Sequence, residues 1–126
     1  MTQGEVRNYA VNARSTDTHG RVMCNVRNHH FVIDGPVQNG CPGEEVTPAE
    51  LFLTGVAACG VELLQSFAKA DQVPLHRVRV EIDGMLDRGN PVRSDLSVLN
   101  AVHLRFNLMG VTPAQGAALI DRFKKR

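Results

Sequence analysis

The chain has 126 residues, which suits one domain with a sizeable core. Its formal net charge is +1 and charged residues make up 21%, so no strong field favours nucleic acid or an anionic membrane surface. It has no tryptophan and a single tyrosine, so no base-stacking platform is evident. We therefore expect neither nucleic acid nor membrane as a partner.

The N-terminal third predicts antiparallel strands. Residues 5–13 and 20–34 carry imperfect alternation of apolar and polar side chains, and turn signals occur at 19–20 and 28–29. We expect a meander of two or three strands there. Residues 35–46 are rich in glycine, proline and polar side chains, which is typical of a loop.

A helix is predicted next, from about residue 47 to residue 71. Thr47 is a good N-cap, Pro48 suits the first turn, and Glu50 completes a capping box. The segment is almost wholly apolar from residue 51 to residue 64, which is too short a run to span a bilayer of about 20 apolar residues. Such a sequence predicts a buried central helix.

The second half predicts two strands and a helix. Val78, Val80 and Ile82 alternate with charged residues, and a polar connection leads to a second alternating strand within residues 98–108. A second helix begins at Thr112–Pro113. The predicted order is βββ-α-ββ-α, an α+β fold in a single domain over residues 1–126.

Small residues interrupt the central helix at four positions: Gly55, Ala57, Ala58 and Gly60. Each glycine lowers helix stability by about 1 kcal/mol relative to alanine, so this pattern indicates that another backbone comes close. That backbone belongs either to the protein's own sheet or to the same helix of a second subunit. Because one sheet covers only one face of an apolar helix, we expect a homodimer.

Three cysteines at irregular spacing, Cys24, Cys41 and Cys59, argue against a disulfide framework. Together with an N-terminus that lacks an apolar signal region, they predict a cytoplasmic protein. We interpret Cys24 as a core residue of a strand and Cys41 as a more accessible loop cysteine. His29 and His30 are adjacent and would point to opposite faces of a strand, and the other three histidines are scattered. No zinc-type cysteine spacing occurs either, so we predict neither a metal site nor a cofactor.

Cys59 lies halfway along the predicted helix and has two interpretations. It is either a small buried hydrophobe or a reactive thiol whose thiolate is stabilised by a cation from elsewhere in the fold. The effect of the helix dipole fades within one turn of the N-terminus, so it cannot stabilise a thiolate at Cys59. Glu62 shares the face of Cys59, whereas Glu50 points to the opposite face. Glu62 is therefore a candidate to hydrogen-bond the thiol or a substrate, although an unpaired carboxylate would raise the thiol pKa.

The segment from Pro48 to Cys59, Pro-Ala-Glu-Leu-Phe-Leu-Thr-Gly-Val-Ala-Ala-Cys, resembles the helix motif of the OsmC/Ohr superfamily, the osmotically inducible and organic hydroperoxide resistance proteins. The resemblance extends to strands at 30–34 and 78–83 and to the final helix. It implies an intertwined homodimer with its central helices packed together and the active sites at the interface.

The resemblance also implies a thiol-dependent peroxidase of organic hydroperoxides that serves in oxidative stress defence. Cys59 would attack the hydroperoxide, and an external dithiol would reduce the enzyme again. In the family an arginine and a glutamate activate the thiolate. Arg21 is the candidate arginine, and Glu62 is the candidate acid on the cysteine's own face.

The sequence departs from the family pattern at two places. Ala49 stands where the family glutamate follows the helix proline, which favours the general OsmC-like branch over Ohr proper. The sequence stops at Arg126, about where a final strand and a resolving cysteine are expected, so either the protein continues beyond Arg126 or it lacks a resolver of its own. Without one, Cys24, Cys41 or an external thiol would have to resolve the oxidised enzyme. These departures leave an alternative, a non-catalytic dimer of the same fold that binds a small apolar ligand or serves regulation.

Overall fold

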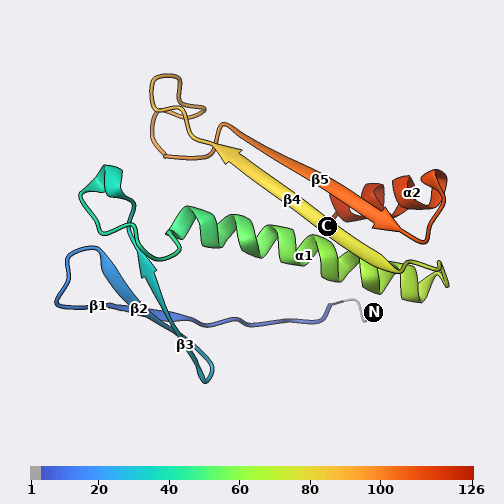
Figure 1. The fold of residues 1–126 in the computed structure, drawn as a ribbon, viewed down its shortest axis with the longest axis horizontal. Coiled ribbons are helices and arrows are strands. Elements are labelled where there is room, and N and C mark those ends of the chain that lie inside the picture. The colour runs from blue at the N-terminus through green and yellow to red at the C-terminus, as the bar shows by residue number, and fades with distance from the viewer. Residues whose placement is uncertain (1–3) are drawn as a thin grey trace. The chain divides into compact units, whose positions relative to one another are not determined.

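The computed structural model describes residues 4–126 and has the strand and helix order predicted from the sequence, βββ-α-ββ-α (Figure 1). A short 3-10 helix, Val37–Asn39, is added between the third strand and the first helix. The α+β prediction is confirmed. The chain divides into two compact units, one that ends at Leu51 and a second, Phe52–Arg126. The single domain expected over residues 1–126 stays a prediction.

The first unit is a three-stranded antiparallel sheet in the order β1-β2-β3, formed by Asn12–Ser15, Arg21–Val26 and His29–Asp34. The predicted turn at 19–20 is present, whereas the second turn lies at 27–28, one residue earlier than expected. Arg27 takes the left-handed conformation there, with φ of 54°. Cys24 is buried, as predicted for a residue of the core.

The loop after β3 folds back onto the start of β2. Gly35 donates its N–H to the carbonyl of Gly20 at 2.8 Å, and Gly43 donates to Gly35 at 3.1 Å. Cys41 lies against both Gly20 and Gly35, because a Cβ at either position would overlap its side chain. This loop cysteine is therefore half-buried rather than open, and the glycines are what allow the close packing.

Helix α1 spans Pro48–Ala70 and begins with the predicted capping box. The Thr47 N–H donates to the Glu50 carboxylate at 2.9 Å, and the Glu50 N–H donates to the Thr47 hydroxyl at 3.4 Å. At the other end Gln72 takes the left-handed conformation and the Val73 N–H reaches back to the carbonyl of Ala68 at 2.8 Å. This closure ends the helix.

The second unit packs α1 and α2, Pro113–Lys124, on an antiparallel hairpin of β4, Arg77–Met85, and β5, Ala101–Met109. A capping box of Thr112 and Gln115 starts α2. The centre of the core consists of Leu64, Phe67 and Ala68 from α1 and Leu119 from α2. Partly buried side chains from β4, β5 and the two helices surround it.

Arg122 of α2 contacts the C-terminal part of α1 and the residue that follows it. The Arg122 guanidinium lies 4.2 Å from the centroid of the buried Phe67 ring and donates to the Asp71 carboxylate at 2.8 Å. We expect Arg122→Ala to lower the free energy of unfolding by about 1 kcal/mol, the sum of a cation–π contact and a half-exposed ion pair. Lys125→Ala, which breaks only the exposed pair with Asp121, is the control. Urea unfolding that shows equal effects of both variants would contradict this role.

The prediction that α1 is buried and too short to cross a membrane needs correction. The helix has 23 residues and is long and apolar enough for a membrane span by length and composition, but only 22% of its most apolar window is buried within the chain. The apolar run at 51–64 is only part of the helix, which continues through its last turns to Ala70. A core helix of a globular protein passes the same test. The single chain thus leaves much of α1 uncovered.

Candidate functional site

Cys59 is an exposed free thiol in the middle of α1. Its neighbour Gly60 is buried, and a Cβ there would lie 3.4 Å from the Phe106 ring, so the helix packs closely on β5 at this point. The next buried positions, Leu64, Phe67 and Ala68, follow at helical spacing. This periodicity turns Cys59 away from the core. Within the described chain the interpretation of Cys59 as a buried hydrophobe does not hold.

Cys59 belongs to an uncovered stripe of α1, which we call the open face. Its members share exposure and the i, i+3, i+4, i+7 spacing of one helix face: Phe52, Gly55, Ala58, Cys59 and Glu62. Phe52 is 62% exposed, and a Cβ at Gly55 would meet nothing within 4 Å. The small residues therefore serve two purposes. Gly60 allows the close approach of the chain's own sheet, and Gly55 leaves an open surface.

Glu62 lies one turn beyond Cys59 on the open face, as the sequence predicts. Its carboxylate accepts a hydrogen bond from the Ser66 hydroxyl at 3.2 Å, on the side away from Cys59. Among the described residues, no hydrogen bond or ion pair engages the Cys59 thiol itself. Cys59 and Glu62 are thus brought to one surface, with the carboxylate held toward the C-terminal end of the helix.

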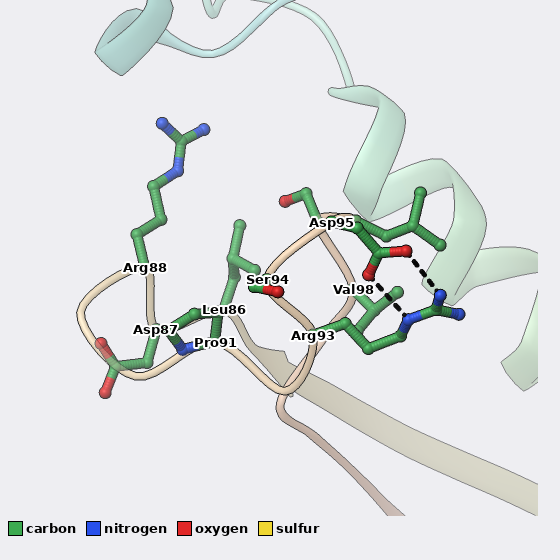
Figure 2. Close-up of a pocket in the computed structure, with 10 residues that line it drawn as sticks. Leu86, Asp87, Arg88, Pro91, Arg93, Ser94, Asp95 and Val98 are labelled. Atoms are coloured by element: carbon green, nitrogen blue, oxygen red, sulfur yellow. Dashed lines mark hydrogen bonds and ion pairs between the residues drawn. The ribbon is translucent and has the colours of Figure 1, made fainter.

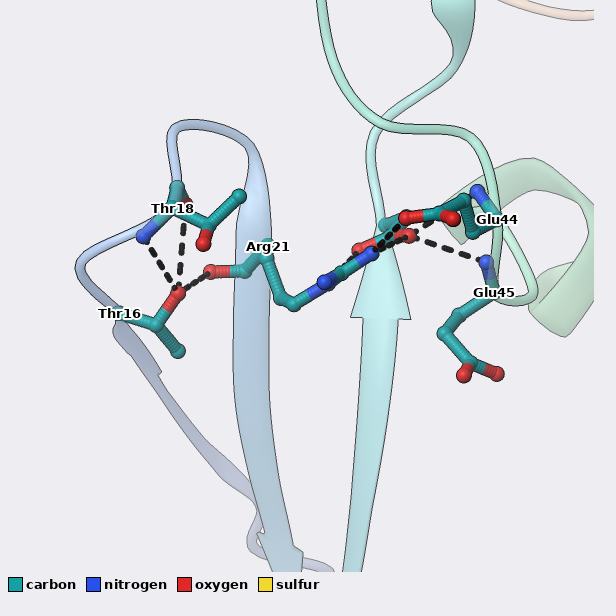
Figure 3. Close-up of polar contacts among 6 residues, drawn as sticks. Thr16, Thr18, Arg21, Glu44 and Glu45 are labelled. Atoms are coloured by element: carbon teal, nitrogen blue, oxygen red, sulfur yellow. Dashed lines mark hydrogen bonds and ion pairs between the residues drawn. The ribbon is translucent and has the colours of Figure 1, made fainter.

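Arg21 belongs to the first unit and is the centre of an ion cluster (Figure 3). Its guanidinium binds the carboxylate of Asp34 with two bonds of 2.8 Å and reaches Glu44 at 2.7 Å. Asp34 is fully buried and also accepts the backbone N–H groups of Glu44 and Glu45, each at 3.0 Å. The hydrogen bonds from Arg21, helped by the two backbone donors, hold the pKa of Asp34 well below its usual range.

This cluster fixes the loop that leads into α1. Asp34 is the last residue of β3, and its partners Glu44 and Glu45 lie at the end of the loop. One carboxylate therefore holds the two ends of this loop together. Arg21 is a candidate from the sequence, whereas its partners Asp34 and Glu44 are not among the sequence-based candidates. The available signal was a carboxylate that directly follows three apolar strand residues, at a position where a buried charge demands a cation. The hydrogen bonds to Asp34 and Glu44 also raise the pKa of Arg21.

The pH dependence of stability follows from the lowered pKa of Asp34. A carboxyl whose pKa falls on folding contributes its stability above its ordinary pKa of about 3.9 and loses it as the pH falls further. We expect Asp34→Asn to lower the melting temperature by several degrees at pH 7. The difference in melting temperature between the wild type and this variant should stay constant down to about pH 5 and shrink below about pH 4.

Asp95→Asn is the matched control, because Asp95 makes a two-bond pair with Arg93 in which both side chains are more than half exposed. Little change in melting temperature is expected from it. A gap between wild type and Asp34→Asn that widens as the pH falls to 3 would contradict the assignment.

The acid nearest the start of α1 serves the helix cap. Glu50 accepts hydrogen bonds from both the N–H and the hydroxyl of Thr47, each at 2.9 Å, and these bonds lower its pKa. Ala49 beside it carries no ionisable group. Within the described chain, the start of α1 thus offers one carboxylate, and that carboxylate is part of the cap.

A cavity of about 440 Å³ lies in the connection between β4 and β5 (Figure 2). It is lined by residues of the segment 86–98 alone, and Asn100 ties the base of this segment by accepting the Asp87 N–H and donating to the Asn90 carbonyl. Arg93 and Asp95 pair with each other, and Arg88 extends away from the other lining side chains. No residue of the open face lines this cavity.

Comparison with known proteins identifies the fold. None of the curated protein sequences matches the chain. Among solved structures, an OsmC-like protein from Mycoplasma pneumoniae has a TM-score of 0.80 at 17% identity, over 95% of this chain and 82% of the other. An organic hydroperoxide resistance protein from Elizabethkingia anophelis has a TM-score of 0.78 at 18% identity, over 98% and 85% of the two chains. A further such protein, OsmC from Legionella pneumophila, has a TM-score of 0.73 at 20% identity, over 96% and 85%.

These likenesses show the fold, an OsmC-like fold as the sequence resemblance predicts. The family assignment rests on a separate match of the sequence to a family model, that of OsmC-like proteins, over residues 41–126. That range contains α1 with Cys59, the hairpin of β4 and β5, and α2. The chain belongs to the OsmC-like protein family.

Proposed function

We propose that this protein is a thiol-dependent peroxidase that reduces organic hydroperoxides, with Cys59 as the nucleophile. The observation that carries the proposal is the exposed thiol at the centre of the open face of α1, in a chain of the OsmC-like family. Two of its structural neighbours are named as organic hydroperoxide resistance proteins. The identities of 18% and 20% support a shared fold, so the activity is our inference.

The chemistry needs only the thiol, the hydroperoxide and a reductant. The Cys59 thiolate attacks the distal oxygen of ROOH, the O–O bond breaks, and the alkoxide leaves and takes a proton to become ROH. The sulfur, oxidised by two electrons, becomes a sulfenic acid. One thiol of an external dithiol then displaces water to give a mixed disulfide. The second thiol displaces Cys59 as its thiol and leaves the dithiol as a disulfide.

Glu62 and Arg21 have different roles in the proposed reaction. Glu62 shares the open face and would accept a hydrogen bond from the Cys59 thiol or from the substrate hydroperoxide. Arg21 would have to act while bound to Asp34 and Glu44, and the nitrogen that these bonds leave unused is Nη1. We therefore propose Cys59 as the reacting group, Glu62 as its polar neighbour, and Arg21 chiefly as the residue that fixes the loop before α1.

The proposed enzyme is a homodimer in which the open face meets its counterpart on a second copy. An apolar helix with Phe52 and Gly55 exposed has surface that a partner would cover, and the lack of a side chain at Gly55 allows two backbones to approach closely. Cys59 would then lie beside the crossing, shielded from bulk water. That environment suits an apolar hydroperoxide better than hydrogen peroxide.

Gly55→Leu tests this surface. In a single chain a Cβ at residue 55 meets nothing within 4 Å, and leucine replaces a helix-destabilising glycine, so we expect the monomer to gain about 0.5–1 kcal/mol of stability. In the dimer the same side chain separates the helices, and we expect the dimer dissociation constant to rise at least about tenfold. Sedimentation equilibrium measures the dimer dissociation constant of the wild type and of the variant.

Ala70→Leu, at the exposed last residue of α1, is the control and should leave the association unchanged. A wild type that sediments as a monomer at micromolar concentration would contradict the dimer. So would an unchanged dissociation constant in Gly55→Leu.

Two observations favour a second candidate, a non-catalytic dimer of this fold that binds a small apolar ligand or serves regulation. Ala49 supplies no carboxylate at the start of α1, and the Arg21 guanidinium is occupied by Asp34 and Glu44. Both activating groups of the expected peroxidase would then be missing or engaged.

Steady-state turnover separates the two candidates. Cumene hydroperoxide and hydrogen peroxide are each supplied with dithiothreitol or a dihydrolipoyl compound, and loss of peroxide is followed. The proposal expects dithiol-dependent turnover with a higher kcat/KM for cumene hydroperoxide. No turnover with either dithiol, or turnover that does not depend on the protein, would favour the non-catalytic candidate.

A further inference from the structure

A second cavity, of about 240 Å³, lies where α1 ends and the chain returns into β4. Its apolar wall is formed by residues from the end of α1, from the connection that follows and from the start of β4: Ala68, Val73, Leu75 and Val78. Ala68 is 3% exposed and belongs to the core of the second unit, and the other three pack around that core. The wall is therefore a fixed part of the fold.

Three polar side chains complete the lining: Gln65, Lys69 and His76. Within residues 4–126 no hydrogen bond or ion pair engages any of the three. No carboxylate lines the cavity, and Asp71, the acid two residues after Lys69, is bound by Arg122 at 2.8 Å. The cavity thus combines an ammonium group, an amide donor and an imidazole, all on exposed residues at its mouth, with an apolar wall.

The position of His76 is set by its backbone and by a neighbouring glycine. The His76 N–H donates to the carbonyl of Met109 at 2.8 Å. The imidazole lies where a Cβ of Gly110 would be, so the ring fits only because residue 110 has no side chain. The imidazole is thereby held at the cavity, while Lys69 is anchored in the last turn of α1.

We propose that this cavity binds a small aliphatic monocarboxylate. Lys69 pairs with the carboxylate, Gln65 and His76 donate hydrogen bonds to it, and the short alkyl chain lies on the apolar wall. The volume is below the range of about 300–1,000 Å³ typical of sites for drug-sized ligands, so the ligand is a small one. The apolar wall distinguishes such a ligand from a hydrated inorganic anion. None of the lining residues belongs to the open face, so the site is separate from Cys59.

The experiment is a titration of the ¹⁵N-labelled full chain with hexanoate, followed by amide chemical shifts. We expect shifts concentrated at Lys69, Val73 and His76, with a dissociation constant of the order of 1 mM, as for a ligand of this size. Lys69→Met should weaken binding at least about fivefold, and Lys69→Arg should restore most of it. Lys124→Met, at the exposed end of α2, is the charge-matched control and should bind like the wild type.

Parallel titrations with hexanol and with inorganic phosphate test the alkyl chain and the anionic group of the proposed ligand separately. Both should shift these amides far less than hexanoate at equal concentration. The proposal is overturned if the hexanoate shifts lie elsewhere or are absent, or if Lys69→Met binds like the wild type. It is equally overturned if hexanol or phosphate matches hexanoate.

Discussion

Cys59→Ser is expected to abolish the dithiol-dependent reduction of cumene hydroperoxide, with a fall in kcat/KM of at least about 1,000-fold. The hydroxyl of serine is not ionised near neutral pH and cannot accept the oxygen atom as a sulfenic acid. Because Cys59 is exposed and makes no contact with the core of its unit, the variant should fold and melt like the wild type. The measurement is steady-state turnover at matched dimer content.

Two further cysteines provide the controls. Cys41→Ser changes a half-buried thiol packed on Gly20 and Gly35, and Cys24→Ala changes a thiol buried in the first sheet. Each should retain at least about half of the wild-type turnover, since the proposal uses an external dithiol as resolver. Activity that survives Cys59→Ser but is lost in Cys41→Ser would move the chemistry to the loop and contradict the proposal.

Gly110→Ala is expected to cause the largest loss of stability of any single methyl group added to this chain. Gly110 has φ of 95°, a conformation that side chains rarely adopt. A Cβ would also overlap the carbonyl oxygen of Pro74 and the ring of His76. Because the carbonyl is backbone, the clash cannot be relieved by a rotamer change. We expect a loss of at least about 3 kcal/mol in the free energy of unfolding.

Gly40→Ala is the matched control. Gly40 has φ of 76°, but a Cβ there meets nothing within 4 Å, so the alanine adds backbone strain without a clash. It should lower stability by only about 1–2 kcal/mol. Chemical denaturation measures the free energy of unfolding of both variants, and the difference between them separates the effect of backbone strain from that of the steric overlap. Equal losses would mean that the contact of Gly110 with the 74–76 return contributes nothing.

Helix boundaries and strand order followed from local signals. The capping residues Thr47 and Thr112, each followed by a proline, predict where α1 and α2 begin, and both boxes are formed in the structure. The alternation that begins at Val78 predicts that this side chain of β4 faces the core, where it packs. These features depend on neighbours within a few residues, which is why a single sequence suffices for them.

The surroundings of the site depended on long-range contacts. Arg21 and Asp34 are 13 residues apart and meet only because β2 pairs with β3, so composition could not assign Arg21 its partners. The burial of α1 was overpredicted because hydrophobicity alone does not say whether the chain's own sheet or another copy covers a face. Gly60 and Gly55 look alike in sequence, yet one is packed on Phe106 and the other is open.

A single turnover tests directly whether Cys59 reduces a hydroperoxide, without any choice of reductant. The pre-reduced protein is mixed with one equivalent of cumene hydroperoxide in the presence of dimedone, which traps sulfenic acids. Cumyl alcohol is then quantified and the trapped residue is identified by peptide mass spectrometry. The proposal predicts one equivalent of alcohol and a dimedone adduct on Cys59. An adduct only on Cys24 or Cys41, or no alcohol above the protein-free rate, would contradict it.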